Sequence, residues 1–505
     1  MRPAAGQVRP LSGLAAMLGA PAAGPRAPLA AVTGITIDSR QVRQGDLYVA
    51  LPGASVHGAA FARAAAEAGG AAVLTDPAGE RDAVASGLPV LVVPDPRAVL
   101  GRVAAWVYER PSEKLLLLGV TGTSGKSTTT FLLEGGLRAA GHRTGLVGGV
   151  EIHVGDLCFT PTLTTPEASD LQGLFALMRE QGVTAAAMEV SSHALALGRV
   201  DGAHYDVALF TNLSQDHLDF HRDLDDYFMT KVRLFTPELA RAGVVNIDDP
   251  HGRELVGLSK IPVTTFSAQG APEADWVARD VRLGADGSTF RVIGPGGVEA
   301  DVSVALPGPF NVANTLGALV TLVEAGVPLQ VAVHGAGTVT GVPGRMERVP
   351  GAQGFQAIVD YSHKPGAVES VLGALREVTS GSLIIVLGCG GDRDRGKRPM
   401  MGEAAARLAD VAILTSDNPR SEDPLRILGE MLQGVLTVPE RDRAHVIMEP
   451  DRACAIDLAI GRARPGDVVV VAGKGHEQGQ YVAGEVLPFD DRQVVAEAIG
   501  RRERT

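Results

Sequence analysis

One stretch of the chain decides its fold: Gly119-Val120-Thr121-Gly122-Thr123-Ser124-Gly125-Lys126-Ser127. It follows the apolar run Leu115–Val120 and precedes a helical stretch that begins at Thr128. A strand, a glycine-rich loop and a helix in this order predict a loop whose backbone N–H groups surround phosphate oxygens. In such a loop Lys126 would reach the outer phosphates, and the Ser127 hydroxyl could bind Mg²⁺.

The loop departs in one place from the strict pattern G-x-x-x-x-G-K-[ST], because Val120 stands where that pattern has its first glycine. A glycine-rich turn with an incidental lysine is the simpler alternative. The strand and helix on either side favour a nucleotide site instead. The loop residues expected to bind ATP are Gly122, Thr123, Ser124, Gly125, Lys126, Ser127 and Thr128.

Short β-branched or Leu-rich runs alternate with Ala-rich helical stretches through most of the chain. This alternation is typical of an α/β fold with parallel sheets. Ligands of open parallel sheets bind beyond the carboxyl ends of the strands, so the polar residues that follow each run are the candidate site residues. The clearest expected strands are Leu115–Val120, Ala185–Val190, Val207–Thr211, Ile384–Gly388, Val411–Thr415 and Val468–Ala472.

Two further polar clusters follow expected strands. One is the stretch 188–193, which contains Glu189, and the other is the stretch 211–219, which contains His217. Carboxylate, imidazole and hydroxyl groups can bind Mg²⁺ while water and phosphate complete its shell. Either residue alone could be a buried, hydrogen-bonded polar side chain, but three such strand ends together indicate one site.

The length of 505 residues suggests about three domains. We expect a smaller α/β domain at residues 1–112, a domain at 113–342 that begins with the phosphate loop, and a domain at 343–505. The last boundary follows Gly341-Val342-Pro343-Gly344, whose glycines and proline predict a hinge. The alternating, Gly-rich stretch 270–300 predicts β-hairpins.

Composition excludes several classes of protein. A formal charge of −12 without a long Lys/Arg run argues against nucleic-acid binding. Three widely spaced cysteines indicate neither a disulfide framework nor a zinc site, and they fit a reducing cytoplasm. No apolar run approaches the roughly 20 residues that span a bilayer. We expect a cytoplasmic monomer that binds neither nucleic acid nor membrane.

The N-terminus faintly resembles a secretory signal, because Arg2 and Arg9 precede the weakly apolar stretch 11–20. We interpret this segment as a short helix followed by a Pro/Ala-rich loop, since export would remove the chain from ATP.

The motifs resemble those of the Mur ligases. Three stretches are similar to the central domain of that family: GVTGTSGKSTT at 119–129, MEVSSHALALGRV at 188–200, and TNLSQDHLDFH at 211–221 followed by Lys231. The usual loop of the family, G-T-x-G-K-[ST], accounts for the missing first glycine. The resemblance runs from Asp38 to about Asp491 and implies a three-domain α/β architecture. A central P-loop domain with a parallel sheet would precede a Rossmann-like C-terminal domain.

The resemblance also assigns residues to ligands. It implies catalytic or metal-binding roles for Lys126, Ser127, Glu189, His217 and Lys231, the last as a carbamate. A free ammonium at Lys231 would repel Mg²⁺, whereas a carbamate reverses the charge and supplies oxygen ligands. Further ATP contacts are expected from Asn311, Asn314, Arg345 and Asp360. The residues expected to touch the UDP-linked substrate are Ser39, Thr164, Thr165, Ser191 and Arg199.

Four features resemble the branch of the family that adds the third residue of the cell-wall peptide: Asp38-Ser39-Arg40 with Gly45-Asp46-Leu47, the stretch 390–399, Asp417-Asn418-Pro419-Arg420, and Gly473-Lys474-Gly475-His476-Glu477. For this branch the implied reaction activates the D-Glu carboxylate of UDP-N-acetylmuramoyl-L-Ala-D-Glu with ATP. A diamino acid then attacks the resulting acyl phosphate. The residues expected to bind it are Arg393, Asp417, Asn418, Pro419, Arg420, Gly473 and Glu477.

The expected amino acid is meso-diaminopimelate. Its second carboxylate suits the guanidinium of Arg420, which can bind it through two parallel hydrogen bonds. The D-N-P-R form resembles the diaminopimelate branch. If Arg420 pairs with Glu422 or Asp423 instead, L-lysine or L-ornithine is the alternative.

Two rivals come from other classes: a P-loop ATPase that couples hydrolysis to motion, and a non-catalytic nucleotide-binding scaffold. The first would leave the stretches 417–420 and 473–477 unexplained, and loss of Lys126, His217 or Lys231 would have favoured the second. Within the family, another Mur ligase or a folylpolyglutamate-type ligase is the nearest alternative. Two positions depart from the family pattern: Leu197, where some relatives have Gln, and Lys364, where Thr or Asn is common. We attach little weight to the second.

Overall fold

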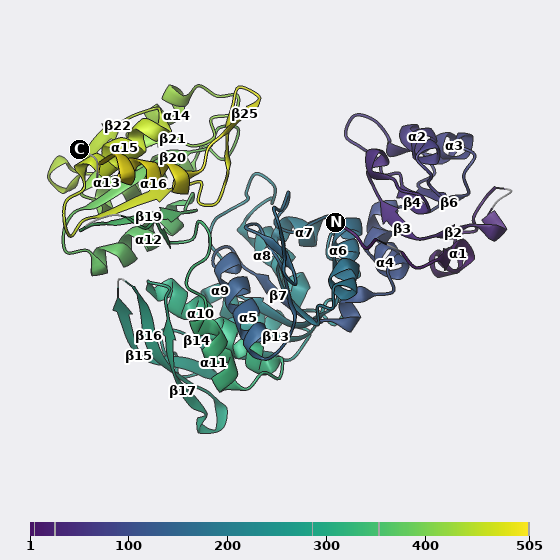
Figure 1. The fold of residues 1–505 in the computed structure, drawn as a ribbon, viewed down its shortest axis with the longest axis horizontal. Helices are drawn as coiled ribbons and strands as arrows, with labels where there is room; N and C mark the ends of the chain where they lie inside the picture. Colours follow the sequence, from purple (N-terminus) through teal and green to yellow (C-terminus); the bar gives the residue numbers. More distant parts are fainter. Residues whose placement is uncertain (5, 25–26, 285, 352–353, 503–505) are drawn as a thin grey trace.

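The computed structural model describes residues 1–4, 6–24, 27–284, 286–351 and 354–502. Three lobes follow one another along the chain, each built around its own main sheet (Figure 1). The N-terminal and C-terminal lobes lie at opposite ends of the molecule, and the middle lobe lies between them (Figure 1).

The N-terminal lobe has a sheet of four parallel strands in the order β3-β4-β5-β6. The apolar stretch at 11–20 forms the helix α1 and its C-terminal cap, which confirms the interpretation as a short helix. The elements are β1 (Arg9–Pro10), α1 (Leu11–Leu18), η1 (Ala27–Leu29), β2 (Ala31–Val32), β3 (Gly34–Thr36), η2 (Ser39–Gln41), β4 (Asp46–Val49), η3 (Gly58–Phe61), α2 (Ala62–Glu67), β5 (Ala72–Thr75), α3 (Glu80–Ala85), β6 (Val90–Val92), α4 (Pro96–Val107) and η4 (Pro111–Lys114).

The middle lobe has an 11-stranded sheet in the order β10-β9-β8-β11-β7-β12-β13-β14-β15-β16-β17. Its helical elements are α5 (Lys126–Ala139), α6 (Ala168–Glu180), α7 (Ser192–Ala196), α8 (Leu224–Val232), η5 (Arg233–Phe235), α9 (Pro250–Leu258), η6 (Pro295–Gly297), α10 (Pro309–Glu324) and α11 (Leu329–Gly337). Its strands are β7 (Leu116–Thr121), β8 (Thr144–Val147), β9 (Ile152–Val154), β10 (Leu157–Phe159), β11 (Ala185–Glu189), β12 (Tyr205–Phe210), β13 (Ala240–Asn246), β14 (Val263–Ser267), β15 (Trp276–Gly284), β16 (Gly287–Ile293) and β17 (Glu299–Val304).

The centre of this sheet is parallel, and its two edges are antiparallel. β7 pairs in parallel with β11 on one side and with β12 on the other. Two apolar cores cover the two faces, which explains why the central strands are apolar on both sides. At the edge β15, β16 and β17 pair antiparallel, which confirms the hairpins expected at 270–300.

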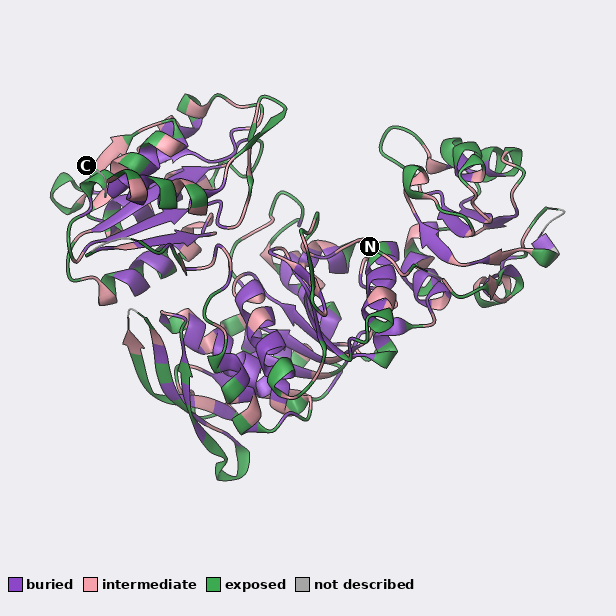
Figure 2. Cartoon of the chain, viewed as in Figure 1, coloured by how far each residue is buried: buried purple, intermediate pink, exposed green. Residues whose placement is uncertain are grey.

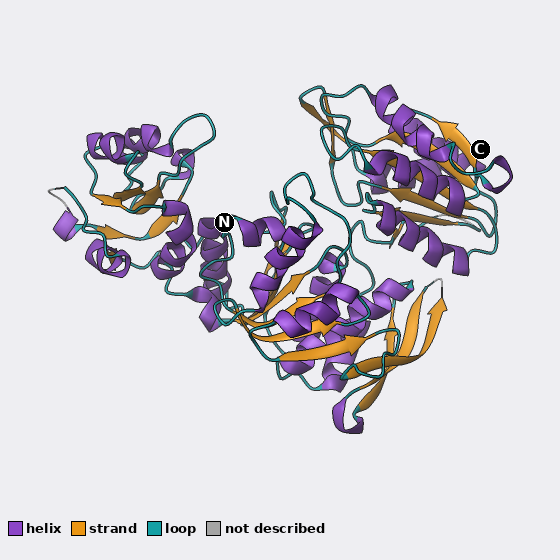
Figure 3. Cartoon of the chain, turned by 180° about the vertical axis from the view of Figure 1, so that it is seen from behind, coloured by secondary structure: helices purple, strands orange, loops and turns teal. Residues whose placement is uncertain are grey.

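The C-terminal lobe has a six-stranded sheet in the order β18-β19-β23-β20-β21-β22, parallel except for β18. Helices lie on both faces of this sheet (Figure 3), and its strands are buried between them (Figure 2). The doubly wound arrangement agrees with the expected Rossmann-like domain. Its elements are β18 (Glu347–Arg348), β19 (Gln356–Asp360), α12 (Pro365–Val378), β20 (Leu383–Cys389), α13 (Lys397–Leu408), β21 (Val411–Ser416), α14 (Pro424–Val435), η7 (Glu440–Asp442), β22 (His445–Met448), α15 (Arg452–Arg462), β23 (Val468–Ala472), β24 (Gly479–Val482), β25 (Glu485–Pro488) and α16 (Asp491–Arg502).

All six strands expected from the apolar runs are present, with ends that differ by one or two residues; only Val468–Ala472 has the expected bounds. Strand ends are the least certain part of such a prediction, because the backbone pairing that defines a strand need not stop where the apolar run stops. In the part of the chain that the structure describes, no helix combines the length and the apolar character needed to cross a membrane.

A fully buried ion pair joins α15 to the start of α16. Arg452 donates through Nε and Nη2 to the two carboxylate oxygens of Asp491, each at 2.7 Å, and both side chains are 0% exposed. Arg452 also donates to the carbonyl oxygens of Ser416 and Ala472, at the ends of β21 and β23. The pair therefore ties two helices to two strand ends of the C-terminal sheet.

Replacing one partner of this pair should destabilise the protein, because it leaves the other charge buried without compensation. We expect Asp491→Asn to lower the free energy of unfolding by about 3–5 kcal/mol in denaturant titrations. Asp442→Asn, which removes an exposed ion pair with Arg441, is the control and should change that free energy by less than about 1 kcal/mol. Equal effects of the two substitutions would contradict this role of the buried pair.

Candidate active site

The loop after β7 keeps its shape through two glycines in the left-handed region of φ. Gly122 has a φ of 144°, and a Cβ there would lie 1.9 Å from Thr211 Oγ1. Gly125 has a φ of 88°, and a Cβ there would lie 2.3 Å from Asn314 Oδ1. Only glycine permits both the conformation and the approach, so the loop passes closely between the end of β12 and the start of α10.

Residues after β12 hold this loop through hydrogen bonds. Thr123 N donates to the Asn212 carbonyl oxygen and Ser124 N to Asn212 Oδ1, both at 2.9 Å. Thr211 Oγ1 donates to the Ser124 carbonyl oxygen at 2.7 Å. The loop ends at Lys126, where α5 begins, and a helix N-terminus attracts anions.

The Lys126 side chain folds back over the loop. Its Nζ donates to the carbonyl oxygens of Gly122 and Thr123, each at 2.9 Å. Burial, together with the nearby charge of Lys364, lowers the pKa of Lys126 to about 8. An anion at this position would favour the charged ammonium, which suits a lysine that binds phosphate.

Ser127, in the first turn of α5, meets Glu189, the last residue of β11. Ser127 Oγ donates to Glu189 Oε1 at 2.8 Å, and the same oxygen accepts Gly149 N at 2.9 Å. Arg345 from the C-terminal lobe donates to Ser127 Oγ at 3.1 Å. A hydroxyl and a buried carboxylate side by side are hard oxygen donors, which fit a Mg²⁺ ion.

His217 has a backbone that non-glycine residues seldom adopt, with a φ of 55°. Its Nε2 lies 2.8 Å from Asp216 Oδ2, and its ring meets the His193 ring edge to face, with centroids 4.7 Å apart. In these contacts His217 faces Asp216 and His193 rather than Glu189.

Lys231 is buried against the phosphate loop and is 1% exposed. Its Nζ donates to the Gly122 carbonyl oxygen at 2.9 Å and lies 4.5 Å from the centre of the Tyr227 ring. Burial first, and then the charge of Lys126, lower the pKa of Lys231 well below its ordinary value. A neutral amine is the form that reacts with carbon dioxide, so the environment suits the expected carbamate.

A cavity of about 670 Å³ lies between the middle and C-terminal lobes, over the carboxyl ends of β7, β11 and β12. Most of the residues expected to bind ATP and metal line it, together with two of those expected to bind the UDP-linked substrate. The expected site residues in its wall are Thr123, Ser124, Gly125, Lys126, Ser127, Thr128, Thr164, Glu189, Ser191, His217, Asn311, Asn314, Arg345 and Asp360.

The C-terminal lobe contributes cations to this cavity. Lys364 Nζ lies 2.6 Å from Asp216 Oδ2, and the Arg345 guanidinium lies over the Tyr361 ring at 4.3 Å from its centre. Burial alone would raise the pKa of Asp216, but the hydrogen bond with His217 and the charge of Lys364 hold it well below its ordinary value. Asp216 therefore stays charged and links His217 to the C-terminal lobe.

Asp360 lies at the end of β19 with both carboxylate oxygens engaged. Oδ2 accepts Met346 N at 2.8 Å, and Oδ1 accepts the backbone N and the hydroxyl of Ser362. In this arrangement Asp360 shapes the backbone on both sides of the cavity. Oδ2 accepts one bond among those described, so it can accept a second from a hydroxyl of ATP, the contact that the resemblance implies for Asp360.

The residues expected to bind the UDP-linked substrate lie in two places. Thr165 is buried, donates to the Glu189 carbonyl oxygen at 2.8 Å and accepts Ser191 N at 3.2 Å. Arg199 Nε lies 2.9 Å from Glu167 Oε1. Glu167 also accepts Arg97 of α4 at 2.7 Å, so this ion-pair chain connects the middle and N-terminal lobes.

Ser39 begins η2 in the N-terminal lobe, at a distance along the chain from the other expected residues. A second cavity, of about 290 Å³, is lined by Arg40 and Gln41 and by Arg2, but not by Ser39. The Arg40 guanidinium is held by both carboxylate oxygens of Asp38, each at 2.9 Å. Both arginines at this cavity are therefore already paired with carboxylates, Arg40 with Asp38 and Arg2 with Asp46.

The residues expected to bind the amino acid meet at the carboxyl ends of β21 and β23. Asn418 Oδ1 accepts Lys474 Nζ at 2.9 Å, and Asn418 Nδ2 donates to Glu477 Oε2 at 2.9 Å. A Cβ on Gly473 would lie 2.7 Å from Asp417 Oδ2, so the glycine permits a close approach. One cluster is therefore formed by two segments distant in sequence.

Arg420, which follows Pro419, does not pair with Glu422 or Asp423, the alternative considered from the sequence. Its Nη1 donates to the Gly391 carbonyl oxygen at 2.6 Å. Glu422 is paired with Arg398 instead, and Asp423 caps α14. Arg393 extends outward and lies 3.9 Å from Asp219 of the middle lobe, more than half exposed.

The sequence interpretation missed two participants, both of them lysines. Lys364 was given little weight, although it faces the cavity and pairs with Asp216. Lys474 is 0% exposed and bonds to Asn418 and Glu477. Lys474 stood inside a stretch that had been singled out, and a lysine within five residues of the end of a strand is the signal that also identified Lys126.

Three family profiles match the chain in succession: "Mur ligase family, catalytic domain" at residues 31–108, "Mur ligase middle domain" at 120–322, and "Mur ligase, glutamate ligase domain" at 344–475. A protein of Streptomyces avermitilis named UDP-N-acetylmuramoyl-L-alanyl-D-glutamate–2,6-diaminopimelate ligase is 59% identical, covering 99% of this chain and 98% of its own. A protein of the same name from Corynebacterium glutamicum is 46% identical over 93% of this chain and 92% of its own.

Comparison with solved structures points to the same family. One titled as the structure of a UDP-N-acetylmuramoyl-L-alanyl-D-glutamate–2,6-diaminopimelate ligase superposes with a TM-score of 0.67 at 34% identity, covering 95% of this chain and 96% of its own. The MurF ligase of Thermotoga maritima in complex with ADP has the same fold, with a TM-score of 0.65 at 20% identity over 94% and 98% of the two chains. From the three consecutive domain profiles and the near full-length relatives, the chain belongs to the Mur ligase family.

Proposed function

We propose that this chain is an ATP-dependent ligase that adds meso-diaminopimelate to UDP-N-acetylmuramoyl-L-Ala-D-Glu in peptidoglycan synthesis. The observation that carries the proposal is the convergence of three adjacent strand ends on one cavity, which cations of the C-terminal lobe complete. The names of the near full-length relatives support the same reaction. Since the reaction uses ATP, we propose the cytoplasm as its compartment.

The chemistry explains why ATP is needed. A free carboxylate is a poor acylating agent, because its leaving group would be oxide. The D-Glu carboxylate attacks the γ-phosphorus of ATP, ADP leaves, and an acyl phosphate forms. The amine of the diamino acid then attacks the acyl carbon, loses a proton, and expels phosphate as the amide forms.

The first step brings two anions together, so cations must screen them. Lys126 and the backbone N–H groups of its loop would bind the outer phosphates of ATP, with Arg345 and Lys364 approaching from the C-terminal lobe. Burial and the charge of Lys364 lower the pKa of Lys126 to about 8, and a phosphate beside it would favour the charged ammonium.

Mg²⁺ would be held by Ser127 and Glu189, with His217 and carbamylated Lys231 nearby as further candidates. Bound there, the ion would neutralise phosphate charge and polarise the phosphoryl group. The chain itself keeps Glu189 in place through Gly149 N and buries the carboxylate, so that its oxygen faces Ser127.

We assign one ligand to each domain: the uridine diphosphate to residues 1–112, ATP to 113–342, and the amino acid to 343–505. The reacting groups come from different domains, so the domains must close around them. Closure would exclude water from the acyl phosphate, which water would otherwise hydrolyse. We expect the chain to act as a monomer.

For the amino acid we favour diaminopimelate over L-lysine or L-ornithine. Arg420 follows Asn418 by two residues, and its guanidinium donates to the Gly391 carbonyl oxygen. In the described bonds no carboxylate is paired with it directly, although the charge of Asp392 lies near. The second carboxylate of diaminopimelate can pair with it, whereas lysine leaves the guanidinium unpaired. Glu477 and Asn418 would bind the distal ammonium.

The test of the reaction is phosphate release by the purified protein with ATP, UDP-N-acetylmuramoyl-L-Ala-D-Glu and a panel of amino acids. Release should require both the nucleotide-linked substrate and an amino acid. Equal release without an amino acid would favour an ATPase and contradict the proposal.

Lys126→Ala should reduce phosphate release at least about a hundredfold, because the cation that screens the phosphates is lost. Little packing depends on this side chain, so circular dichroism and the melting temperature should stay unchanged. Lys260→Ala, at an exposed lysine, is the matched control. Turnover of the Lys126 variant equal to that of the control would refute the assignment.

Lys231→Ala should be nearly inactive and should regain part of its activity with short carboxylic acids such as formate or acetate. The added carboxylate would replace the oxygen ligands of the carbamate. Lys126→Ala, assayed in parallel, should not be rescued, since it lacks a cation rather than an anion. Full activity of the Lys231 variant without added acid would contradict a carbamate on Lys231.

Arg420→Ala should lower kcat/KM for diaminopimelate about a hundredfold and leave the low value for lysine almost unchanged, because only diaminopimelate offers a second carboxylate. Arg426→Ala, at an exposed arginine of α14, is the control. A wild-type enzyme that prefers lysine or ornithine would contradict the choice of substrate and leave the ligase reaction intact.

A further inference from the structure

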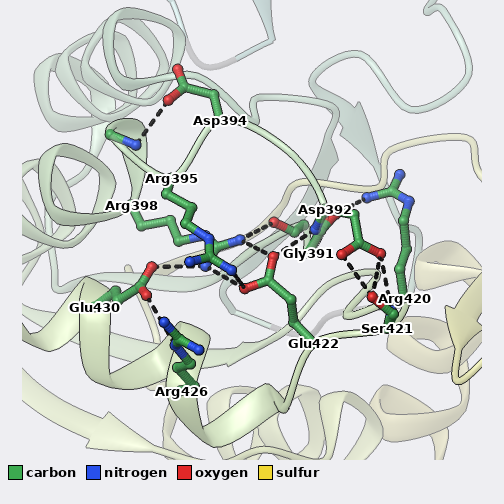
Figure 4. A network of polar contacts seen from close by, with 12 residues as sticks. Gly391, Asp392, Asp394, Arg395, Arg398, Arg420, Ser421, Glu422, Arg426 and Glu430 are labelled. Atoms are coloured by element: carbon green, nitrogen blue, oxygen red, sulfur yellow. Dashed lines mark hydrogen bonds and ion pairs between the residues drawn. The ribbon is translucent and has the colours of Figure 1, made fainter. Parts of the chain in front are cut away.

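A network of charges lies directly behind the loop that carries Arg420 (Figure 4). At its centre is Arg398, in the first turn of α13, whose side chain is 0% exposed. Its Nη2 donates to Glu422 Oε1 at 2.8 Å, and its Nη1 donates to Glu422 Oε2 at 3.1 Å and to Glu430 Oε2 at 2.7 Å. A buried arginine with this fork of bonds has one fixed position.

The network reaches the backbone of a second loop. Arg398 Nη2 donates to the Gly390 carbonyl oxygen at 3.1 Å, and Glu422 Oε1 accepts Asp392 N at 2.6 Å. The pair Arg398–Glu422 therefore holds both ends of the segment 390–392, which follows β20, by hydrogen bonds. Glu422 itself belongs to the loop after β21, so the pair joins two neighbouring strand ends.

The two loops are in close contact where they face the amino-acid cluster. Gly391 N donates to the Asn418 carbonyl oxygen at 2.9 Å, and a Cβ on Gly391 would lie 1.9 Å from the Pro419 carbonyl oxygen. Arg420 Nη1 donates back to the Gly391 carbonyl oxygen at 2.6 Å. The position of the Arg420 guanidinium therefore depends on where the Gly391 backbone is held.

The backbone conformation of both loops needs such support. Asp392 and Arg420 have φ values of 51° and 54°, a region that residues other than glycine seldom adopt. Such conformations persist only where the surroundings hold them. Besides the Glu422 bond to Asp392 N, the Ser421 hydroxyl donates to both carboxylate oxygens of Asp392, at 2.8 and 2.9 Å.

We propose that Arg398 and Glu422 are positioning residues for the amino-acid substrate: by fixing the segments 390–392 and 419–422 against each other, they set the place of Arg420 and with it the choice of diamino acid. This inference rests on the proposed function. Neither residue touches the cluster of Asn418 and Glu477 in the described bonds, so both act through Arg420.

The experiment compares two isosteric substitutions in the full-length protein. Glu422→Gln replaces the carboxylate that bonds to Arg398 and to Asp392 N by a neutral amide, which weakens the bonds that hold the segment 390–392. Glu430→Gln is the matched control, because Glu430 also pairs with Arg398 but its side chain bonds to neither loop, only to Arg398 and Arg426 in the described contacts. The measurements are KM for diaminopimelate, ATP and UDP-N-acetylmuramoyl-L-Ala-D-Glu, and the ratio of kcat/KM for diaminopimelate to that for lysine.

We expect Glu422→Gln to raise KM for diaminopimelate about tenfold to a hundredfold and to lower the selectivity over lysine, since a small displacement of a binding group has such effects. The KM values for the other two substrates should stay within about twofold, and Glu430→Gln should leave all three within about twofold. An unchanged KM for diaminopimelate in Glu422→Gln, or equal increases in both variants, would overturn the proposal, as would a joint rise of all three KM values.

Ser421→Ala keeps the proposal testable if Glu422→Gln does not fold, because Ser421 is exposed and its loss removes only the bonds to Asp392. Ser421→Ala should raise KM for diaminopimelate about fivefold, the effect expected for one lost hydrogen bond. An unchanged KM would then overturn the proposal. A wild-type protein that releases no phosphate with diaminopimelate would refute the proposed function instead, so the two failures are distinguishable.

Discussion

Parallel pairing of β7 with β11 and β12 is the constraint on which the rest of the site depends. The register places Glu189 opposite Val120 and Phe210 opposite Thr121, so three polar segments leave the sheet at the same level. Since the strands run parallel, all three segments emerge at one edge. The phosphate loop, the carboxylate and the segment with His217 are therefore neighbours although long stretches of chain separate them.

The C-terminal lobe completes this site rather than merely lying next to it. Arg345 bonds to Ser127, Lys364 pairs with Asp216, and His476 contacts the carbonyl oxygen of Gly149 at 2.9 Å. Gly149 in turn donates to Glu189. The middle and C-terminal lobes thus share hydrogen bonds around the cavity, so a movement of one lobe against the other would directly affect the geometry of Glu189.

Electrostatics gives the cavity its preference for anions. The pKa of each of Lys126, Lys231 and Lys364 is lowered: the charge of Lys364 acts on Lys126, the charges of Lys126 and Lys364 act on Lys231, and the charges of Lys397 and Arg345 act on Lys364. Burial is the first cause in all three cases, and repulsion by neighbouring cations adds to it, opposed at Lys364 by Asp216. Two responses relieve this repulsion: a polyphosphate can bind, or one amine can become a carbamate. The proposed reaction uses both.

The sequence alone determined the α/β class, the order of the motifs and most of the expected nucleotide-site residues that line the cavity. These follow from local patterns: an apolar run predicts a buried strand, and the glycines of the loop report a backbone that only glycine adopts. The predicted strand ends were within two residues of those observed, because the polar residue that ends an apolar run is visible in the sequence itself.

Only the tertiary structure decided which side chains pair with one another. The sequence could not show that Lys364 pairs with Asp216, that Lys474 is buried beside Asn418, or that Arg393 extends toward Asp219. Each of these contacts joins segments distant in the chain, and two of the three join different lobes. Their formation depends on how sheets and lobes pack against one another, and no local pattern of residues encodes that packing.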